Sequence, residues 1–410
     1  QSWIEAISIK GESPSASVAG EPLQFHIQSR DREGRERTSG GDAFYVRLIG
    51  PSIVMGQVTD NDDGSYQVDA VANDPGEYSL EVKLMYEDHA GLNEHGQGDG
   101  HDALYWHIQG SPFSVSVTGQ LPETAASGAS RPLCHGETQG RWVRRELCES
   151  KAVDCSLADD GDSMVWSPLG CRLQRYTKDL LSTCFDGNLI MAGSSQVRTM
   201  FFDLVAIGGS TQVIPRKYWS DVEATDMKPP IYFHWMVPQY SNDGDGLLDY
   251  DLLLTELDQF VGKHYTGTTD TLTVQASLHD LHFGELEEYE INIKRMANYI
   301  KAVPARRSFR FGDAIHMPPG GRSIVERGLR GPRVSRANDL ARPAMQAEDV
   351  PVFDSHKITF PRPEMSRDGY HYFEYPSEER SERGEEVCIG NAVARTTTHV
   401  WLNELCNPQI

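Results

Sequence analysis

The stretch Leu189-Ile-Met-Ala-Gly-Ser-Ser-Gln-Val-Arg198 decides the fold of the larger part of this chain. Its apolar residues predict a buried strand, Gly193 breaks that strand, and a helical pattern follows. A corner of this kind presents the hydroxyl group of Ser195 at the carboxyl end of a strand, where the sites of parallel sheets form. The corner is therefore a candidate nucleophile site, although phosphate cradles and plain helix caps share the pattern.

Strand and helix patterns alternate around this corner, as parallel strands joined by crossover helices require. The expected fold class of this region is an α/β/α domain with a mainly parallel sheet. Strands are predicted at residues 188–192, 230–236, 271–276 and 308–311, and helices at 196–206, 248–263 and 285–302.

A second segment, Met365-Ser-Arg-Asp-Gly-Tyr-His371, carries the residue types that activate a serine. An imidazole takes the proton of the attacking hydroxyl, and a carboxylate holds the imidazole in the required tautomer. The spacing of three residues lets Asp368 reach one ring nitrogen of His371 while the other nitrogen faces Ser195. By itself this segment is more often a surface turn. Together with the first segment it predicts a catalytic triad of Ser195, His371 and Asp368.

These segments resemble blocks of the SGNH (GDSL-like) hydrolases. Gly193-Ser-Ser-Gln-Val-Arg198 is similar to the Gly-Asp-Ser-x-x-Arg block of the PC-esterase branch, which includes trichome-birefringence-like proteins, sialic-acid O-acetyltransferases and neurexophilin-and-PC-esterase proteins. The lead-in Trp166-Ser-Pro-Leu-Gly-Cys171 and the closing Val352-Phe-Asp354 and Arg367-Asp-Gly-Tyr-His-Tyr372 are similar too. The resemblance covers roughly residues 134 to 376 and implies an SGNH-hydrolase fold.

The resemblance also implies an oxyanion and substrate site at Gly193, Ser194, His279 and Arg198. Ser277-Leu-His279 stands where this branch has Gly-x-His, so His279 is the expected donor to the oxyanion, beside backbone N–H groups of the Ser195 corner. The sequence departs from the family at two positions. The glycine before His279 is absent, and Ser194 replaces the first block's aspartate.

Two functions follow from these residues. The first is a carbohydrate O-acyl (acetyl) transferase or esterase that uses no cofactor, acts on a glycan or acylated carbohydrate and proceeds through an acyl-enzyme on Ser195. The second is a catalytically inactive extracellular structural or adhesion protein with the esterase fold as a scaffold. We predict the first function. The alternative draws on the two departures from the family pattern and on a filamin-like module in the N-terminal third of the chain.

Residues 1–118 have a different pattern. Alternating apolar segments such as 44–48 and 66–70, separated by Gly, Pro, Asn and Asp turns, are typical of an all-β sandwich. Asp63-Gly-Ser-Tyr66, Pro75-Gly-Glu-Tyr78 and Gly110-Ser-Pro-Phe-Ser-Val115 resemble a filamin-type immunoglobulin-like repeat in order and spacing. The resemblance implies a module that binds a glycan or a protein partner, or that sets distance.

A chain of 410 residues exceeds what one core normally supports. Residues 119–133 are rich in small residues and read as a linker. The predicted organisation is a filamin-type domain at 1–118, this linker, and an SGNH/PC-esterase-like domain at 134–410.

All seven cysteines follow residue 133. None forms a Cys-x-x-Cys metal site, and their clustering at both ends of the second domain favours disulfides in a secreted or lumenal protein, in the Golgi lumen or at the cell surface. Reduced cysteines in a cytosolic protein are the alternative. An odd count leaves at least one cysteine unpaired or bonded to another chain. The disulfide candidates are Cys134, Cys148, Cys155, Cys171, Cys184, Cys388 and Cys406.

The chain begins at Gln1 and has no apolar run of the roughly 18–20 residues that span a membrane. A cleaved signal peptide or a trimmed anchor would explain both features, and a chain shortened for laboratory expression would explain them equally well.

The net charge of the chain argues against some kinds of binding partner. The chain has 60 acidic and 38 basic residues, a formal net charge of -22, which argues against nucleic acid or an anionic membrane as the main partner. An arginine-rich stretch interrupts this acidity, and we expect it to be a solvated loop and helix, or else a rim that contacts an acidic sugar. Its members are Arg306, Arg307, Arg322, Arg327, Arg330, Arg333, Arg336 and Arg342.

Two patterns of metal-ligand type are also present, and we expect no metal at either. The Asp/Gly-rich stretch 241–249 has Leu252 where a calcium loop needs a bidentate glutamate. His89, His95, His101 and His107 lack the spacing of zinc ligands.

Overall fold

The structure, a computed structural model, divides into two compact units. The first unit contains Gln1–Leu133, Gln139–Leu173 and Pro318–Arg322, and the second contains Cys134–Thr138, Gln174–Met317 and Ser323–Ile410. The structure describes residues 7–9, 13–31, 33–86, 106–119, 131–150, 153–158, 162–212, 214, 220–237, 248–276, 278–316, 331–366, 368–374 and 389–407.

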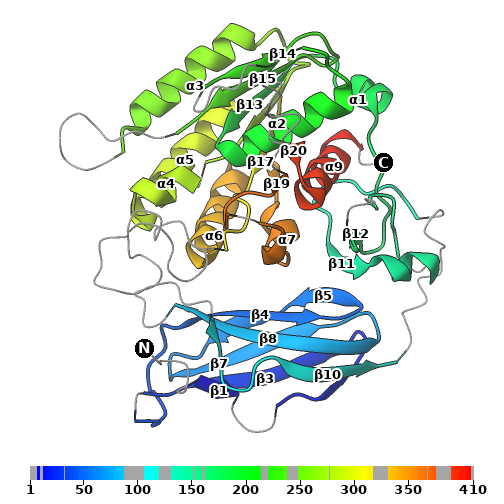
Figure 1. The fold of residues 1–410 in the computed structure, drawn as a ribbon. Coiled ribbons are helices and arrows are strands. Elements are labelled where there is room, and N and C mark those ends of the chain that lie inside the picture. The colour runs from blue at the N-terminus through cyan, green and yellow to red at the C-terminus, as the bar shows by residue number, and fades with distance from the viewer. Residues whose placement is uncertain are drawn as a thin grey trace, which may run out of the picture. The chain divides into compact units, whose positions relative to one another are not determined.

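The first unit is built from two β-sheets that enclose one core (Figure 1). Burial alternates along β3, so that Leu23, Phe25 and Ile27 point inward, as in a strand with one solvated face. This confirms the predicted β-sandwich. One sheet has the order β1 (Ile7–Ile9), β3 (Pro22–Ser29), β7 (Ser65–Val71), β6 (Gln57–Asp60). The other sheet contains β5 (Ser52–Met55), β4 (Ala43–Ile49), β8 (Gly76–Tyr86), β10 (Phe113–Thr118) and β2 (Ala16–Val18), with β9 (Trp106–His107) paired to β8.

The second sheet of this unit continues beyond the expected filamin-type domain. Strand β11 (Gly140–Arg144) pairs with β5 and with β12 (Met164–Pro168), and a 3-10 helix, η3 (Arg145–Ser150), follows β11. Arg141 forms a bidentate ion pair with the buried carboxylate of Asp74, and both nitrogen–oxygen distances are 2.6 Å. The expected second domain began at residue 134, whereas these contacts join residues 139–173 to the first unit.

The second unit contains a six-stranded sheet. Five adjacent strands of this sheet, β15, β13, β16, β17 and β18, run parallel to one another. Its edge strand β14 is antiparallel to β15. The predicted mainly parallel sheet is therefore present, and each of the four predicted strands belongs to it. The order is β14 (Val222–Ala224), β15 (Ile231–Trp235), β13 (Leu189–Gly193), β16 (Thr271–Val274), β17 (Arg306–Arg310), β18 (Val352–Phe353), and a separate pair joins β19 (Phe373–Glu374) to β20 (Ile389–Gly390).

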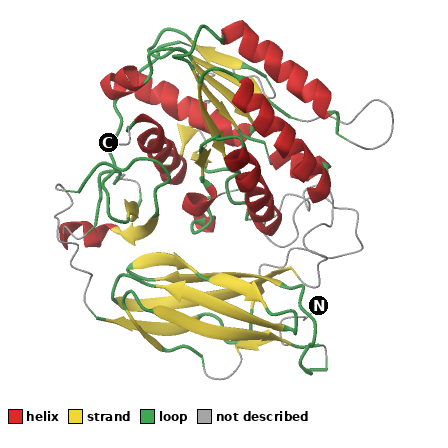
Figure 2. Cartoon of the chain, turned by 180° about the vertical axis from the view of Figure 1, so that it is seen from behind, coloured by secondary structure: helices red, strands yellow, loops and turns green. Residues whose placement is uncertain are grey.

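Helices cover both faces of this sheet (Figures 1 and 2). Helix α2 (Ser195–Gly208) packs against α1 (Lys178–Cys184) and α9 (Ala392–Cys406) on one face. On the other face α3 (Tyr250–His264) packs against α5 (Leu286–Ala302), and α5 packs against α6 (Gly331–Ala347). The short elements are α4 (Leu278–Phe283), α7 (His356–Thr359) and the 3-10 helix η5 (Pro363–Met365).

This topology has a switch point at the end of β13. The chain leaves β13 through α2 toward β15, but it leaves the neighbouring strand β16 toward β17 in the opposite direction. Right-handed crossovers in opposite directions put their helices on opposite faces of the sheet. The carboxyl ends of β13 and β16 therefore border the switch point where open α/β sheets place their ligands.

The arginine-rich stretch differs from the expected solvated surface at several positions. Arg333 is buried and donates to the carbonyl oxygens of Leu281 (3.1 Å) and Gly284 (3.2 Å). The Arg306 guanidinium lies 4.7 Å from the Phe185 ring centroid. These side chains stabilise the interior instead of forming a rim. Arg342 pairs with Glu137 and Asp354, Arg336 is exposed, and Arg322, Arg327 and Arg330 lie outside the described residues.

Disulfides occur in both units. Cys148 is bonded to Cys155, and Cys184 at the end of α1 is bonded to Cys406 at the end of α9. Cys134 and Cys171 are also disulfide-bonded. The predicted oxidation is therefore present for six cysteines, and Cys388 lies outside the described residues.

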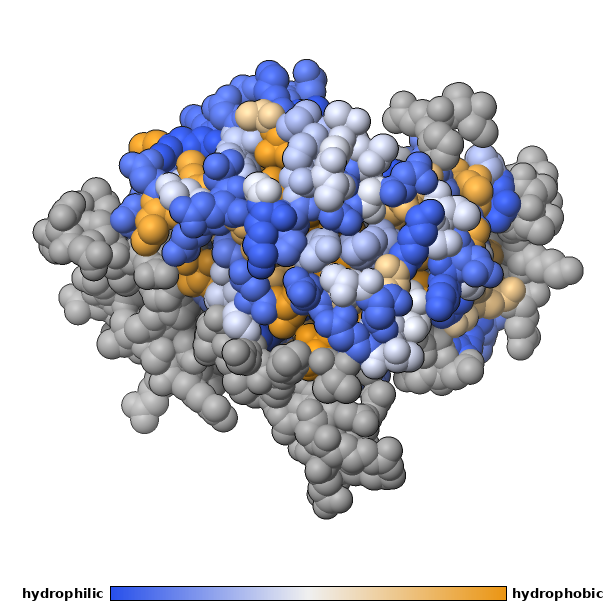
Figure 3. Space-filling model, turned by 90° about the horizontal axis from the view of Figure 1, so that it is seen from above, coloured by the Kyte–Doolittle hydropathy of each residue, from blue (hydrophilic) through white to orange (hydrophobic). Residues whose placement is uncertain are grey.

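Hydrophilic side chains dominate the face seen in Figure 3, where apolar ones form small separate patches. This agrees with the mean hydropathy of the sequence, -0.48. In the part of the chain that the structure describes, no helix combines the length and the hydropathy that crossing a membrane requires.

Candidate active site

The nucleophile corner depends on the glycine between β13 and α2. Gly193 has a φ of +156°, and a Cβ atom there would lie 2.7 Å from Val197 Cγ2 and 3.1 Å from Gln275 Cβ. A side chain at position 193 would therefore crowd both α2 and the residue that follows the neighbouring strand β16. Because α2 begins immediately at Ser195, the corner places the Ser195 hydroxyl at the carboxyl edge of the sheet.

The neighbouring Ser194 is the N-cap of α2. Its Oγ accepts a hydrogen bond from the Gln196 backbone N–H at 3.3 Å and donates one to Gln275 Oε1 at 2.7 Å. Ser194 is only 4% exposed, so its hydroxyl serves the corner's internal bonding. The family resemblance predicts this residue among the oxyanion and substrate groups, whereas both hydrogen bonds of its hydroxyl lie within the corner and its support.

The segment that carries the predicted base is a tight turn around a carboxylate. Asp368 Oδ1 accepts hydrogen bonds from the backbone N–H groups of Tyr370 (2.9 Å) and His371 (2.8 Å). Gly369 has a φ of +83°, a conformation that glycine adopts without strain. The turn therefore presents the second oxygen of Asp368 to the ring of His371.

The structure brings the three predicted triad residues into one hydrogen-bonded chain. Ser195 Oγ lies 2.6 Å from His371 Nε2, and His371 Nδ1 lies 2.6 Å from Asp368 Oδ2. If Nδ1 carries the proton that Asp368 accepts, Nε2 is free to accept the serine proton. Both side chains of the pair are partly exposed, 25% for His371 and 33% for Asp368, so a substrate can approach.

The charge of Asp368 is favoured at this position. Burial opposes ionisation, but the hydrogen bond and electrostatic attraction of His371 and the two backbone N–H donors outweigh it and lower the pKa of Asp368. An ionised carboxylate at this position can hold the neighbouring imidazole and stabilise it when it becomes protonated.

A second group of side chains lies at the same edge of the sheet. His279 is in the first turn of α4, and its ring centroid lies 5.8 Å from that of Trp235 in an edge-to-face arrangement. The Arg198 guanidinium lies 5.1 Å from the Trp235 ring centroid. Trp235 pairs with Gly193 across β13 and β15, so this group borders the nucleophile corner. Ser277, beside His279, lies outside the described residues.

Trp235 was not among the residues predicted from the sequence. It lies near the carboxyl end of the strand predicted at 230–236, and this place in the pattern was the signal that could have marked it.

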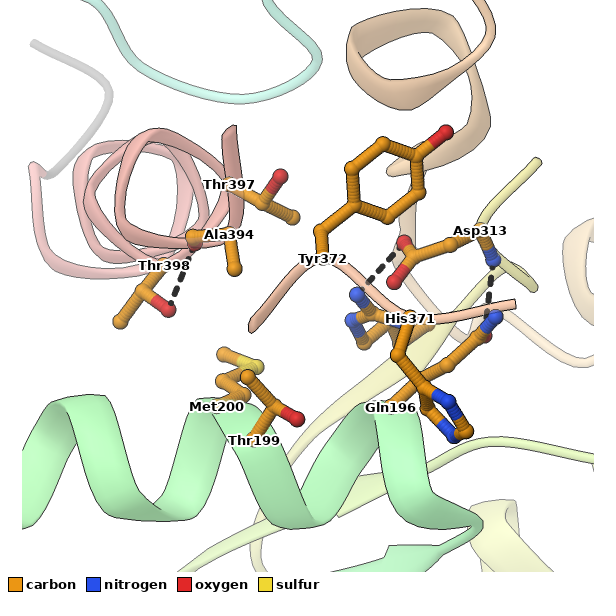
Figure 4. A pocket seen from close by; sticks show the side chains of 10 residues that line it. Gln196, Thr199, Met200, Asp313, His371, Tyr372, Ala394, Thr397 and Thr398 are labelled. Atoms are coloured by element: carbon orange, nitrogen blue, oxygen red, sulfur yellow. Dashed lines mark hydrogen bonds and ion pairs between the residues drawn. The ribbon is translucent and has the colours of Figure 1, made fainter. Parts of the chain in front are cut away.

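A polar pocket adjoins His371 on the side of α2 and α9, as Figure 4 shows. In this pocket the Asp313 backbone N–H donates to Gln196 Oε1 at 2.9 Å, and Arg310 Nη2 lies 2.6 Å from Asp313 Oδ1. The sequence analysis missed these residues because nothing in their local pattern marks them. The lining residues are Gln196, Thr199, Met200, Arg310, Asp313, His371, Tyr372, Ala394, Thr397 and Thr398.

Among the described residues, no cluster of three or more His, Cys, Asp or Glu side chains is arranged to hold a metal ion. Asp249 caps α3 by accepting from the Leu252 N–H at 2.8 Å, and His107 lies 2.9 Å from the Ser111 hydroxyl. The remainder of the acidic stretch, residues 241–247, and His89, His95 and His101 lie outside the described residues.

Comparison with known sequences identifies the N-terminal module. Residues 4–114 match the family model described as the Filamin/ABP280 repeat, which confirms the predicted repeat. The chain is 30% identical over 125 residues to the flagellar outer arm dynein alpha chain of Chlamydomonas reinhardtii, covering 30% of this chain and 2% of that protein. It is 28% identical over 113 residues to the E3 ubiquitin-protein ligase TRIM45 of Bos taurus, and the match covers 27% of this chain and 16% of that protein. The chain thus spans only a small part of these relatives.

Solved structures similar to this chain include a filamin domain and two esterases. The Lin-41 filamin domain has 18% sequence identity and a TM-score of 0.21, and the match covers 28% of this chain and 94% of that one. Axe2, an acetylxylan esterase from Geobacillus stearothermophilus, has 8% identity and a TM-score of 0.32, and the match covers 54% of this chain and 94% of Axe2. An aryl esterase from M. smegmatis has 10% identity and a TM-score of 0.30, covering 53% and 96%.

Proposed function

We propose that the second unit is a serine-dependent enzyme that transfers an acetyl group to a carbohydrate hydroxyl or removes one. The hydrogen-bonded chain from Ser195 through His371 to Asp368 is the observation that carries this proposal. A serine, an imidazole and a carboxylate within this reach can perform nucleophilic acyl transfer, whatever the fold that presents them.

The reaction would begin with attack of Ser195 Oγ on the ester carbonyl carbon while His371 Nε2 takes the hydroxyl proton. The negative charge that develops on the carbonyl oxygen would be stabilised by backbone N–H groups at the Ser195 corner and by His279. His371 would then protonate the departing sugar oxygen. In the second half, the oxygen of water or of another sugar hydroxyl would attack the acetyl carbonyl carbon while His371 Nε2 takes its proton. The bond from this carbon to Ser195 Oγ would then break, and His371 would return the proton to Ser195 Oγ.

The substrate class is proposed from the surroundings of the triad and from the family resemblance. Trp235 offers an aromatic surface of the kind that packs against sugar rings, and Arg198 offers a cation one helical turn after Ser195. A glycan with small ester groups is compatible with both features. The disulfides in both units favour a secreted or lumenal setting. The filamin-type repeat would supply a surface for a protein partner or a glycan.

The alternative function, a structural or adhesion protein without catalysis, is favoured by the hydrogen bonds of Ser194. Ser194, which replaces the family's aspartate, makes bonds that belong to the corner itself, as a helix cap would. If the unit is only a scaffold, the triad geometry would be retained without turnover, and the chain would serve as an extracellular structural or adhesion protein.

Hydrolysis and transfer assays on acetylated and free glycans separate the two functions. We expect wild-type protein to release or transfer acetate, and Ser195→Ala to lose at least about a thousandfold of the activity. The matched variant Ser194→Ala removes the neighbouring hydroxyl and should cost about 1 kcal/mol of stability. Because Ser194 does not contact the reacting atoms, this variant should lose far less activity than Ser195→Ala. Equal rates for wild type and Ser195→Ala on every substrate would support the scaffold function.

A further inference from the structure

Two buried glutamine side chains form a bridge behind the triad. Gln275, the residue after β16, donates from Nε2 to Gln196 Oε1 and to the Phe311 carbonyl oxygen, both at 3.0 Å. Its Oε1 accepts the Ser194 hydroxyl at 2.7 Å. Gln196 is 3% and Gln275 is 2% exposed. Every polar atom of the Gln275 amide therefore has a partner, and the partners determine which way the amide points.

Gln196 extends the bridge toward the base. Its Oε1 accepts a second hydrogen bond, from the Asp313 backbone N–H at 2.9 Å, and its Nε2 donates to the Tyr370 carbonyl oxygen at 3.4 Å. Gln196 directly follows Ser195, and Tyr370 directly precedes His371. One side chain therefore connects the backbones on either side of the proposed proton transfer.

A second connection runs through residues 311–316. The His316 backbone N–H donates to the Gly369 carbonyl oxygen at 2.8 Å, in the turn that carries His371. The same segment is held to Gln196 through Asp313, whose carboxylate pairs with the buried Arg310 at 2.6 Å. Figure 4 shows Gln196 and Asp313 joined beside His371. The Gln196 amide is therefore part of both connections from the nucleophile corner to the base turn, and Gln275 also reaches the second connection directly through the Phe311 carbonyl oxygen.

We infer that Gln196 and Gln275 are positioning residues, which hold the His371 turn at the distance from Ser195 that proton transfer requires. The inference rests on the proposed function. Neither glutamine contacts the reacting atoms. Their effect would be to keep Nε2 of His371 aligned with Ser195 Oγ, because a misplacement of about 1 Å can cost about 100-fold in rate.

Four variants test the inference. Gln196→Met and Gln275→Met retain shape and remove the hydrogen bonds. Gln196→Glu keeps an oxygen for Gln275 and Asp313 but turns a second oxygen, instead of an N–H, toward the Tyr370 carbonyl. It therefore remains informative if the methionine variants fail to fold. Gln346→Met, at an exposed position of α6, is the matched control.

The rate of covalent labelling of Ser195 by a fluorophosphonate is measured for each variant, together with kcat, KM and the melting temperature. We expect the labelling rate and kcat to fall by about 10- to 100-fold in the three bridge variants, with KM within about twofold of wild type. Gln346→Met should match wild type. A purely structural role would lower the melting temperature and leave the labelling rate of the folded fraction unchanged.

A proton NMR signal gives a readout that does not need turnover. The proton shared by His371 Nδ1 and Asp368 should give a downfield resonance in wild type and in Gln346→Met, and should broaden or shift in Gln196→Glu. Unchanged labelling and an unchanged resonance in the folded bridge variants would overturn the inference. Failure of wild type itself to label or turn over, with a resonance that still responds to Gln196→Glu, would instead reject the proposed function and retain the positioning role.

Discussion

Ser195 Oγ lies 2.6 Å from Nε2 of His371, although 176 positions separate the two residues in the chain. Two local structures make this proximity possible. One is the strand-to-helix corner that only a glycine at position 193 allows, and the other is the turn that folds around the Asp368 carboxylate. The corner depends on Gly193 and the turn depends on Asp368. Substitutions in either structure should therefore lower activity.

Asp368→Asn tests the role of the carboxylate. The asparagine oxygen can still accept the two backbone N–H bonds that hold the turn, but its NH₂ group would face His371 Nδ1 and favour the wrong ring tautomer. We expect kcat to fall by a factor on the order of a thousand to ten thousand, with a similar melting temperature. Steady-state kinetics and thermal unfolding check this, and retained kcat would exclude Asp368 from the mechanism.

Most of the framework could be predicted from local patterns. The apolar run before Gly193 predicted β13, and the helical pattern after it predicted α2, since both signals are continuous along the chain. The triad was also predictable, because Asp368 and His371 are close in sequence and each residue type has a recognised chemical role.

The remaining features depend on contacts that no local pattern encodes. The Gln196–Gln275 bridge joins residues 79 positions apart, and glutamine has no preferred role that would mark it. The pairing of β11 with β5 likewise depends on tertiary contacts such as the ion pair between Arg141 and Asp74. Burial of Arg333 was unexpected because arginine is rarely buried without specific partners, here the carbonyl oxygens at the end of α4.

Trp235 should affect binding more than chemistry. Trp235→Ala removes the aromatic surface under Arg198 and beside His279, so we expect KM for a glycan ester to rise about tenfold with kcat changed by less than about threefold. Trp235→Phe keeps a ring and should recover most of the loss. Kinetics on a glycan ester and on a small ester without a sugar check this. A fall in kcat at constant KM would contradict a binding role.

Stability should depend on pH through Asp203. Burial raises the pKa of this carboxyl to about 7, and the N–H of Gly390 and the hydroxyl of Thr398 only partly offset that effect. The folded protein therefore binds more protons than the unfolded chain between about pH 4 and about pH 7, so the free energy of unfolding decreases as pH rises through this window and then levels off.

Asp203→Asn removes this contribution. We expect the variant to be more stable than wild type above pH 7, by an amount on the order of 2–4 kcal/mol, and to show a flatter dependence on pH. Urea unfolding of both proteins from pH 4 to pH 9 measures the difference. A difference that stays constant across this range would mean that Asp203 does not titrate with folding.

The bond between Cys184 and Cys406 should stabilise the second unit strongly. It closes a segment with a sequence separation of 222, and loop-closure entropy predicts a loss of up to about 5 kcal/mol in the Cys184→Ser, Cys406→Ser double variant. The Cys148–Cys155 pair, with a separation of 7, closes a much shorter loop and should cost about 2 kcal/mol in the first unit. Calorimetry with and without reductant checks both. Unchanged unfolding of the second unit after reduction would contradict the expected contribution.

Covalent labelling by a fluorophosphonate, with the adduct located by mass spectrometry, tests the central claim most directly. The reagent reacts with a serine only when a neighbouring base activates it. We predict one adduct, on Ser195, that is absent in Ser195→Ala and at least about a hundredfold slower to form in His371→Ala, both variants melting near the wild-type temperature. Absence of an adduct on Ser195 in the folded wild-type protein, or equal labelling in His371→Ala, would contradict the proposed activation of this serine.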